Sequence, residues 1–352
     1  MRSGEFEWID QLARRFGSGK RNDGLVGIGD DAAVIPVGGS TGEDLSGDAI
    51  VISVDAQVEG VHFRPEWIGY HDLARRLLHI GFSDIAAMGA RAQYALVSVE
   101  AGSGCEQADL DAFTDGMQSG LEEVGARLIG GNVSARGGGF SAHVTAIGRQ
   151  KQSYLLYRSG AHSGDGIYVT GHLGSASAAI RALSAPTIKN QTIPQSLLEA
   201  YRHPRAHLRE GLALAESGWA TAAIDISDGL SADLGHLCGA SGIGAIIELE
   251  DLPISDALRS WRANDPQGVH DWALRGGEDY VLLFTAPADP AKEALMRRNF
   301  AEIGASFWRV GTATSETQLR SRRAGQIRPL EPRGYDHFRD SPRGTQGGTV
   351  NP

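Results

Sequence analysis

The sequence has little cysteine and no long apolar segment. Its two cysteines, Cys105 and Cys238, do not have the spacing of metal ligands, so we expect two free thiols that are at least partly buried. No apolar run approaches the ~18 residues that a membrane helix needs, and the N-terminal segment has no apolar core of the signal-peptide type. We therefore expect a cytoplasmic protein that does not enter a membrane.

The sequence is also short of positive charge. Its 33 Lys and Arg residues stand against 43 Asp and Glu, which gives a formal net charge of -10. A general nucleic-acid binder needs a basic surface to offset phosphate charge, so this class is disfavoured. A small phosphorylated substrate is still compatible, because carboxylates can hold Mg²⁺ and Mg²⁺ can hold phosphates.

The common phosphate-binding and nucleophile motifs are missing. Residues 17–20 (GSGK) resemble the end of a P-loop, but Arg14 stands where that pattern needs its first glycine, and no apolar strand precedes it. Residues 38–42 (GGSTG) fit the nucleophile-elbow pattern, but they lie in a polar segment rather than at a strand-to-helix turn. If the protein uses ATP, it does so without the common phosphate loop.

Predicted strands alternate with predicted helices along the chain. The first 16 residues predict an amphipathic helix, with Phe6, Ile9, Leu12 and Phe16 near one face. Further helices are expected at 71–88, 108–124, after 174, at 205–217 and from about 229, and strands at 49–54, 93–100, 127–131, 141–148, 166–171, 221–225, 244–250 and 279–285. This alternation indicates an α/β (α+β) protein with two lobes, residues 1–150 and 151–338, followed by a disordered tail at 339–352.

Acidic residues gather at turns and after apolar strands. They are Asp30, Asp31, Asp55, Asp84, Asp225 and Asp228, with Glu278 and Asp279 after a Gly-Gly pair. Each of them alone is typical of a helix cap or a turn. The repeated order of apolar strand, aspartate and glycine, however, places carboxylates at strand ends, where α/β folds often bind ligands. Carboxylate oxygens are ligands that Mg²⁺ prefers, so the pattern predicts a magnesium site.

Eight segments together resemble the thiamine-monophosphate kinase family. They are GIGDDAAV (27–34), VDAQVEGVHF (54–63), SDIAAMGA (83–90), GGNVS (130–134), RSGAHSGDGIYVTGHLG (158–174), AIDISDGLSADLGH (223–236), GGEDYVLLF (276–284) and GYDHF (334–338). They occur in the order typical of the family and span the chain from about residue 4 to 338. Each segment alone is a weak indication, whereas the combination is specific.

The resemblance implies a fold and a set of ligands. The fold is that of the wider superfamily that includes aminoimidazole ribonucleotide synthetase, with an N-terminal domain that dimerises through its sheet and a C-terminal α/β domain. Residues 1–150 would bind ATP and several Mg²⁺ ions and form the homodimer, and residues 151–338 would form the second domain. The implied substrates are ATP and thiamine monophosphate.

The resemblance also implies roles for single residues. The implied Mg²⁺ ligands are Asp31, Ser53, Asp55, Asp84 and Asp225, with Asp228 at a further metal-linked position. The implied ATP contacts are Gly131, Asn132, Arg158 and Ser227, and the implied thiamine-phosphate contacts are His62, Glu278 and Tyr335. Read without the family, His62 could be a packed core histidine, Arg158 an ion-pair residue, Tyr335 a residue that fastens the C-terminus, and Gly131 a turn glycine.

Two positions depart from the family pattern. Val54 replaces a common threonine, so only its main-chain carbonyl could serve as a metal ligand. Asn132 stands where many members have aspartate, which keeps an oxygen ligand for a metal but removes a charge. The asparagine leaves one metal site weaker or differently occupied.

The expected reaction is direct in-line transfer of a phosphoryl group from ATP to thiamine monophosphate. The acceptor is an ionised phosphate oxygen, so alignment and charge neutralisation would provide the catalysis without a strong general base. Two alternatives stay open at this point. One is an ATP-dependent ligase or synthase on the same scaffold, and the other is a non-catalytic nucleotide- or thiamine-binding regulator, which the departures at Val54 and Asn132 would favour.

Overall fold

The structure is a computed structural model of the whole chain. It describes all residues except 1–3, 18, 20–23, 38–46, 185–191 and 336–352. The tail predicted at 339–352 and residues 38–42 of the polar segment therefore lie outside the described residues. The two cysteines are free, Cys238 buried and Cys105 partly exposed. Among the described helices, none is both long and apolar enough to cross a membrane.

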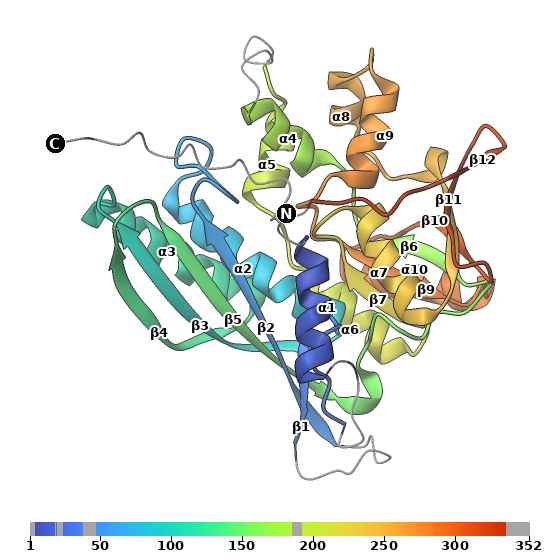
Figure 1. Cartoon of the computed structure of the whole chain (residues 1–352), viewed down its shortest axis with the longest axis horizontal. Coiled ribbons are helices and arrows are strands. Elements are labelled where there is room, and N and C mark those ends of the chain that lie inside the picture. Colours follow the sequence, from blue (N-terminus) through green and yellow to red (C-terminus); the bar gives the residue numbers. More distant parts are fainter. Residues whose placement is uncertain (1–3, 18, 20–23, 38–46, 185–191, 336–352) are drawn as a thin grey trace.

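The first half of the chain forms a five-stranded sheet with two helices on one face (Figure 1). Its strands run in the order β1-β2-β5-β3-β4. They are β1 (Ala33–Pro36), β2 (Asp48–Val58), β3 (Arg91–Gly102), β4 (Arg127–Arg136) and β5 (Ser141–Lys151). Only the β3–β4 pair is parallel. Helices α2 (Tyr70–Ala87) and α3 (Gln107–Val124) pack against one another and against this sheet.

Helix α2 approaches the sheet closely because of a glycine. A Cβ atom added at Gly81 would lie 2.4 Å from Cγ1 of Val144 in β5, so a side chain there would push the helix away from the sheet. A glycine inside the helix predicted at 71–88 could have interrupted it. The structure shows a continuous helix in which the glycine serves packing.

The second half forms a seven-stranded sheet in the order β12-β11-β8-β10-β6-β9-β7. The strands are β6 (Gly166–Val169), β7 (Ala222–Asp225), β8 (Gly244–Glu248), β9 (Leu282–Ala286), β10 (Trp308–Thr314), β11 (Leu319–Arg323) and β12 (Gln326–Pro329). The helices are α4 (Ser175–Ser184), α5 (Gln195–Arg202), α6 (Leu208–Ser217), α7 (Leu230–Ser241), α8 (Asp256–Trp261), α9 (Pro266–Arg275) and α10 (Pro290–Glu302). The α/β (α+β) class expected from the alternation is confirmed.

Helix α2 connects the halves. Besides the first sheet, α2 contacts α6 and β7 of the second half, and buried residues of both halves belong to one continuous apolar core. The predicted N-terminal helix is present as α1 (Glu5–Phe16), which stands between the two sheets in Figure 1. The end of α2, the end of β7 and the start of α1 therefore lie near the junction of the halves, where the site is found.

Candidate active site

Three aspartates from separate elements meet at the junction of the two halves. Asp31 precedes β1, Asp84 lies in the last turn of α2, and Asp225 is the last residue of β7. One carboxylate oxygen from each lies within 4.8 Å of the others. Asp31 and Asp225 are only 8% and 4% exposed, so three carboxylates share a site that is largely removed from water.

Neighbouring side chains hold these carboxylates in place. The Ser53 hydroxyl donates to Oδ2 of Asp84, and the Ser83 hydroxyl donates to Oδ2 of Asp225 at 2.6 Å. Arg158 donates through Nε (3.0 Å) and Nη2 (2.7 Å) to Oδ1 of Asp31. Among these three carboxylates, only that of Asp31 is paired directly with Arg158.

The electrostatics of the cluster favour a bound cation. Burial raises the pKa of Asp31 to about 8, and repulsion from Asp225 and Asp30 adds to this while Arg158 opposes it. Burial, followed by repulsion from Asp225, Asp31 and Asp55, also raises the pKa of Asp84 well above its usual range. Among the described residues, Oδ2 of Asp31 is buried without a hydrogen-bond partner. An oxygen-only donor set with an unpartnered carboxylate oxygen fits a hard divalent cation such as Mg²⁺.

Asp55 and Asp228 extend the acidic surface from the cluster toward a cavity. Burial, with repulsion from Glu278 and Asp225, raises the pKa of Asp55 to about 6. Burial raises the pKa of Asp228 to about 7, and Glu5 and Asp225 contribute repulsion. Both aspartates line a cavity of about 670 Å³ between the two halves.

All three residues predicted to contact the acceptor line this same cavity. They are His62, Glu278 and Tyr335, and the predicted ATP contact Ser227 lines it too. Nδ1 of His62 accepts the N–H of Val58 at 3.1 Å, so a neutral His62 ring carries its proton on Nε2. The main chain of Glu278 donates to the Ser227 carbonyl at 2.8 Å, and that of Tyr335 donates to the Asp228 carbonyl at 3.3 Å. Residues that are more than 200 positions apart in the sequence therefore line the same cavity.

Two predicted residues lie elsewhere in the subunit. Asn132 of β4 is in register with Ser98, His143 and Ala56 on successive strands, so three strand spacings, roughly 14 Å, separate it from β2. Gly131 is a strand glycine rather than a turn glycine. A Cβ atom there would lie 1.9 Å from the carbonyl oxygen of Val97, so close strand packing accounts for it.

Like Gly131 and Asn132, the Val54 side chain does not lie at the aspartate cluster. It is 66% exposed, whereas its neighbour Ser53 is 8% exposed, because alternate side chains of β2 point to opposite faces of the sheet. Only the main chain of Val54 remains near the cluster, as the sequence had implied for any metal contact. Asp55 also lies within β2, which continues to Val58, so the expectation that it ends a strand is wrong.

Comparison with known proteins decides the family. Residues 29–150 match the model of the AIR synthase related protein, N-terminal domain, and residues 162–323 match the C-terminal domain of the same family. The thiamine-monophosphate kinase of Salmonella typhimurium is 34% identical over 96% of this chain and 99% of that protein. The chain belongs to the thiamine-monophosphate kinase family.

Solved structures of this kinase family agree with the fold. AaThiL complexed with AMPPCP and TMP matches with a TM-score of 0.79 and 27% identity, covering 96% of this chain and 99% of that one. The thiamine-monophosphate kinase of Stenotrophomonas maltophilia K279a matches with a TM-score of 0.70 and 32% identity, covering 90% and 96% of the two chains. The resemblance inferred from the eight sequence segments is therefore confirmed.

Sequence reasoning gave no role to several side chains at this kinase-family site. Ser83, which is bonded to Asp225, was passed over although it precedes Asp84 directly. Arg76 was missed, and its ion pair with Glu278 reaches the cavity wall. A signal existed for Arg76, because it lies three residues after Leu73 and four before Ile80, on the apolar side of the predicted helix.

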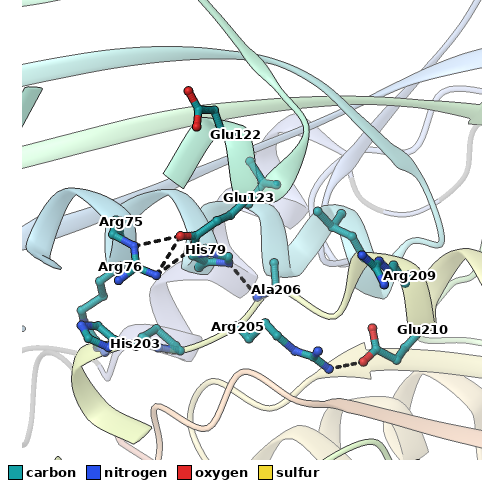
Figure 2. A pocket seen from close by; sticks show the side chains of 13 residues that line it. Arg75, Arg76, His79, Glu122, Glu123, His203, Arg205, Ala206, Arg209 and Glu210 are labelled. Atoms are coloured by element: carbon teal, nitrogen blue, oxygen red, sulfur yellow. Dashed lines mark hydrogen bonds and ion pairs between the residues drawn. The ribbon is translucent and has the colours of Figure 1, made fainter. Parts of the chain in front are cut away.

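A second cavity of about 600 Å³ lies apart from the aspartates, between α2, the end of α3 and the segment that leads into α6 (Figure 2). Its charged side chains largely neutralise one another. Arg75 pairs with Glu123 at 2.8 Å, Nε2 of His79 lies 2.8 Å from the same carboxylate, and Arg205 pairs with Glu210. We interpret this cavity as an ion-paired seam between the halves and assign it no ligand.

The raised pKa values predict how metal and pH act together on stability. Asp31 and Asp55 have a usual pKa of 3.8 and folded values of about 8 and 6. Between the usual pKa and these folded values, the metal-free folded state therefore binds more protons than the unfolded state. The free energy of unfolding of the metal-free protein therefore decreases as the pH rises toward 8. A divalent cation that replaces those protons should stabilise the protein more at pH 8 than at pH 6.

Thermal unfolding in EDTA and in excess Mg²⁺ at both pH values measures this effect. We expect the increase in Tm caused by Mg²⁺ to be larger at pH 8 by about 3 °C or more. The Asp84→Asn variant is the control, and its increase in Tm should be smaller at both pH values. An equal increase at pH 6 and pH 8 in the unmodified protein would contradict metal binding at the cluster.

Proposed function

We propose that this protein transfers the terminal phosphoryl group of ATP to thiamine monophosphate, giving ADP and thiamine diphosphate. The observation that carries the proposal is the buried cluster of Asp31, Asp84 and Asp225 beside a cavity lined by all three predicted acceptor contacts. The relatives support it, since those compared are thiamine-monophosphate kinases and one was solved with AMPPCP and TMP.

The aspartates would hold Mg²⁺ against the phosphates of ATP. Asp31, Asp84 and Asp225 are the core ligands in this proposal, with Asp55, Asp228, Ser53 and the main chain of Val54 beside them. When bound, Mg²⁺ neutralises charge on the phosphoryl group being transferred. Arg158 keeps Asp31 oriented through its two hydrogen bonds and adds positive charge at the edge of the cluster.

The acceptor would occupy the 670 Å³ cavity with its phosphate toward Asp55. His62 and Glu278 offer hydrogen-bonding groups, and the Tyr335 ring can stack on the cationic ring of the acceptor. The acceptor phosphate is already ionised at neutral pH, so the side chains need only align it. A phosphoenzyme intermediate is therefore unnecessary, and we propose direct in-line transfer.

Steady-state ADP formation with thiamine monophosphate and with unphosphorylated thiamine tests the proposal. The alcohol of thiamine would need a general base, whereas this proposal assigns the carboxylates and the histidine of the cavity to the metal and to the binding of the acceptor. We expect kcat/KM for thiamine to be lower on the order of 10²-fold or more. Equal use of both acceptors would refute the assignment. ADP formation that requires a different acceptor would favour the synthase alternative, and no ADP formation at all would favour the regulator.

We further propose a twofold homodimer that closes over the open face of the first sheet. This face lies opposite α2 and α3, and exposed apolar side chains occur on it at Val54 of β2 and Leu96 of β3, both in register with Thr145 of β5. Exposed apolar patches of this kind are typical of interfaces. Gly131 and Asn132 lie too far from the cluster in their own subunit, and the dimer would allow them to contact ATP bound by the partner. We also propose that the chain divides into two domains at about residue 150, that the second domain ends at about residue 338, and that the protein is cytoplasmic.

A further inference from the structure

Arg76 is a buried cation with contacts in both halves of the molecule. It lies on α2 and is 0% exposed. Its Nε donates to Oε1 of Gln57 at 3.0 Å, its Nη1 donates to the Tyr201 carbonyl, and its Nη2 donates to Oε2 of Glu278. A guanidinium so far from water requires a compensating negative charge. In the part of the chain that the structure describes, Glu278 is the only carboxylate paired with it.

Aromatic rings fix the guanidinium further. Its central carbon lies 4.6 Å from the centroid of the Tyr201 ring and 6.0 Å from that of the Tyr280 ring. All three guanidinium nitrogens of Arg76 are hydrogen-bonded, and two aromatic rings lie beside the group, so the Arg76 side chain has little freedom to move. Glu278 must therefore adjust to Arg76.

Glu278 itself lies in an unusual stretch of backbone. Its φ is 76°, and that of Tyr280 is 50°, both in the left-handed region that residues other than glycine seldom adopt. Such conformations persist where the surroundings enforce them, and they cluster at functional sites. The Glu278 and Tyr280 amides donate to the carbonyls of Ser227 and Ile226, each at 2.8 Å, so the loop is tethered at its main chain and at its carboxylate.

One face of the Glu278 carboxylate remains open to the cavity. The Glu278 side chain is 20% exposed while Arg76 is fully covered, so the guanidinium contacts the carboxylate from the protein side. Its positive charge offsets the negative charge of Glu278. A carboxylate paired in this way attracts a distant cationic ring weakly, but its free lone pairs still accept a hydrogen bond from a neutral N–H donor.

We propose that Arg76 is a positioning residue that aims Glu278 at the amino group of the acceptor's pyrimidine ring. This inference rests on the proposed function. In it, Arg76 touches neither substrate and acts only through Glu278. Glu278 recognises the acceptor as a hydrogen-bond acceptor for the ring amine rather than as a counter-ion for the cationic ring.

A double-mutant cycle on KM tests this inference. We expect Arg76→Met and Glu278→Gln each to raise the KM for thiamine monophosphate by about tenfold, with the KM for ATP within about twofold of the unmodified protein. The combined R76M/E278Q variant should match E278Q alone within about twofold, because Arg76 has nothing further to position. Arg75→Met is the matched control, since Arg75 is the adjacent arginine on α2 and pairs with Glu123 away from the acceptor cavity. Its KM values should not change.

An acceptor analogue distinguishes aiming from general support of the fold. Thiamine monophosphate in which an oxygen replaces the pyrimidine amino group can no longer donate there, so the unmodified protein should use it about tenfold less well or worse. R76M and E278Q should both lose this preference. If R76M does not fold, the comparison of R76M/E278Q with E278Q decides, because the double variant leaves no unpaired buried charge.

The outcomes separate the inference from the function on which it rests. If the unmodified protein does not phosphorylate thiamine monophosphate, the proposed function itself fails. If it does, an R76M variant with unchanged acceptor KM, an unchanged preference for the amino acceptor, or a double variant whose effects multiply would overturn the role of Arg76.

Discussion

Asp84→Asn is expected to lower kcat on the order of 10²-fold or more while leaving the metal-free protein at least as stable as before. Asparagine keeps an oxygen that can accept from the Ser53 hydroxyl, so the shape of the site is retained. It removes one of the charges that repel one another, and that repulsion contributes to the raised pKa of Asp84. A structural aspartate would show the opposite pattern, with lower stability and near-normal turnover.

Asp165→Asn is the matched control for this experiment. Asp165 is also buried, at 5% exposure, but its carboxylate accepts from the His162 amide (2.9 Å) and the Thr221 hydroxyl (2.7 Å). Thr221 precedes β7, whereas Asp225 ends that strand, so the control lies at the far end of β7 from the cluster. We expect a lower Tm with kcat within about twofold. Near-normal turnover of Asp84→Asn at millimolar Mg²⁺ would show that the cluster does not carry the chemistry.

The acidic cluster could be predicted from sequence because each aspartate has a recognisable local setting. Asp225 ends an apolar strand, as expected. The same reasoning was wrong for Asp55, since β2 continues for three residues beyond it. A strand in a sheet with one open face can carry charged residues in its middle. An aspartate therefore marks the end of a strand less reliably than the sequence pattern suggested.

Contacts between distant segments could not be predicted from local patterns. Arg76 and Glu278 are 202 positions apart, and only the packing of α2 against the second half brings them together. Strand register is similarly hidden. Asn132 occurs in a segment typical of an ATP contact, yet the order β2-β5-β3-β4 places it three strands from Asp55. Strands β11 and β12 also escaped prediction, because the sequence LRSRR has no alternation of apolar and polar residues.

The position of Asn132 leads to the second large expected effect, which concerns assembly. Leu96→Glu should convert the proposed homodimer to a monomer and lower turnover at least about tenfold, with the subunit still folded. Leu96 is 36% exposed on β3, with Thr145 of β5 and Gly130 of β4 as its register neighbours, so a charge there would be placed within the open face of the sheet. Burying that charge against the partner should raise the dimer Kd by about 30-fold or more.

Turnover should fall because the separated subunit lacks the partner's Gly131 and Asn132. Ile327→Glu is the control, since Ile327 is 47% exposed on β12, at the edge of the other sheet, and its replacement should leave both mass and turnover unchanged. Light scattering gives the mass, and ADP formation over a dilution series gives the turnover. An unmodified protein that is monomeric at every concentration, or a monomeric Leu96→Glu variant with full activity, would show that one subunit holds a complete site. Asn132 would then have no part in binding ATP, since the three strand spacings on its own sheet keep it from the cluster.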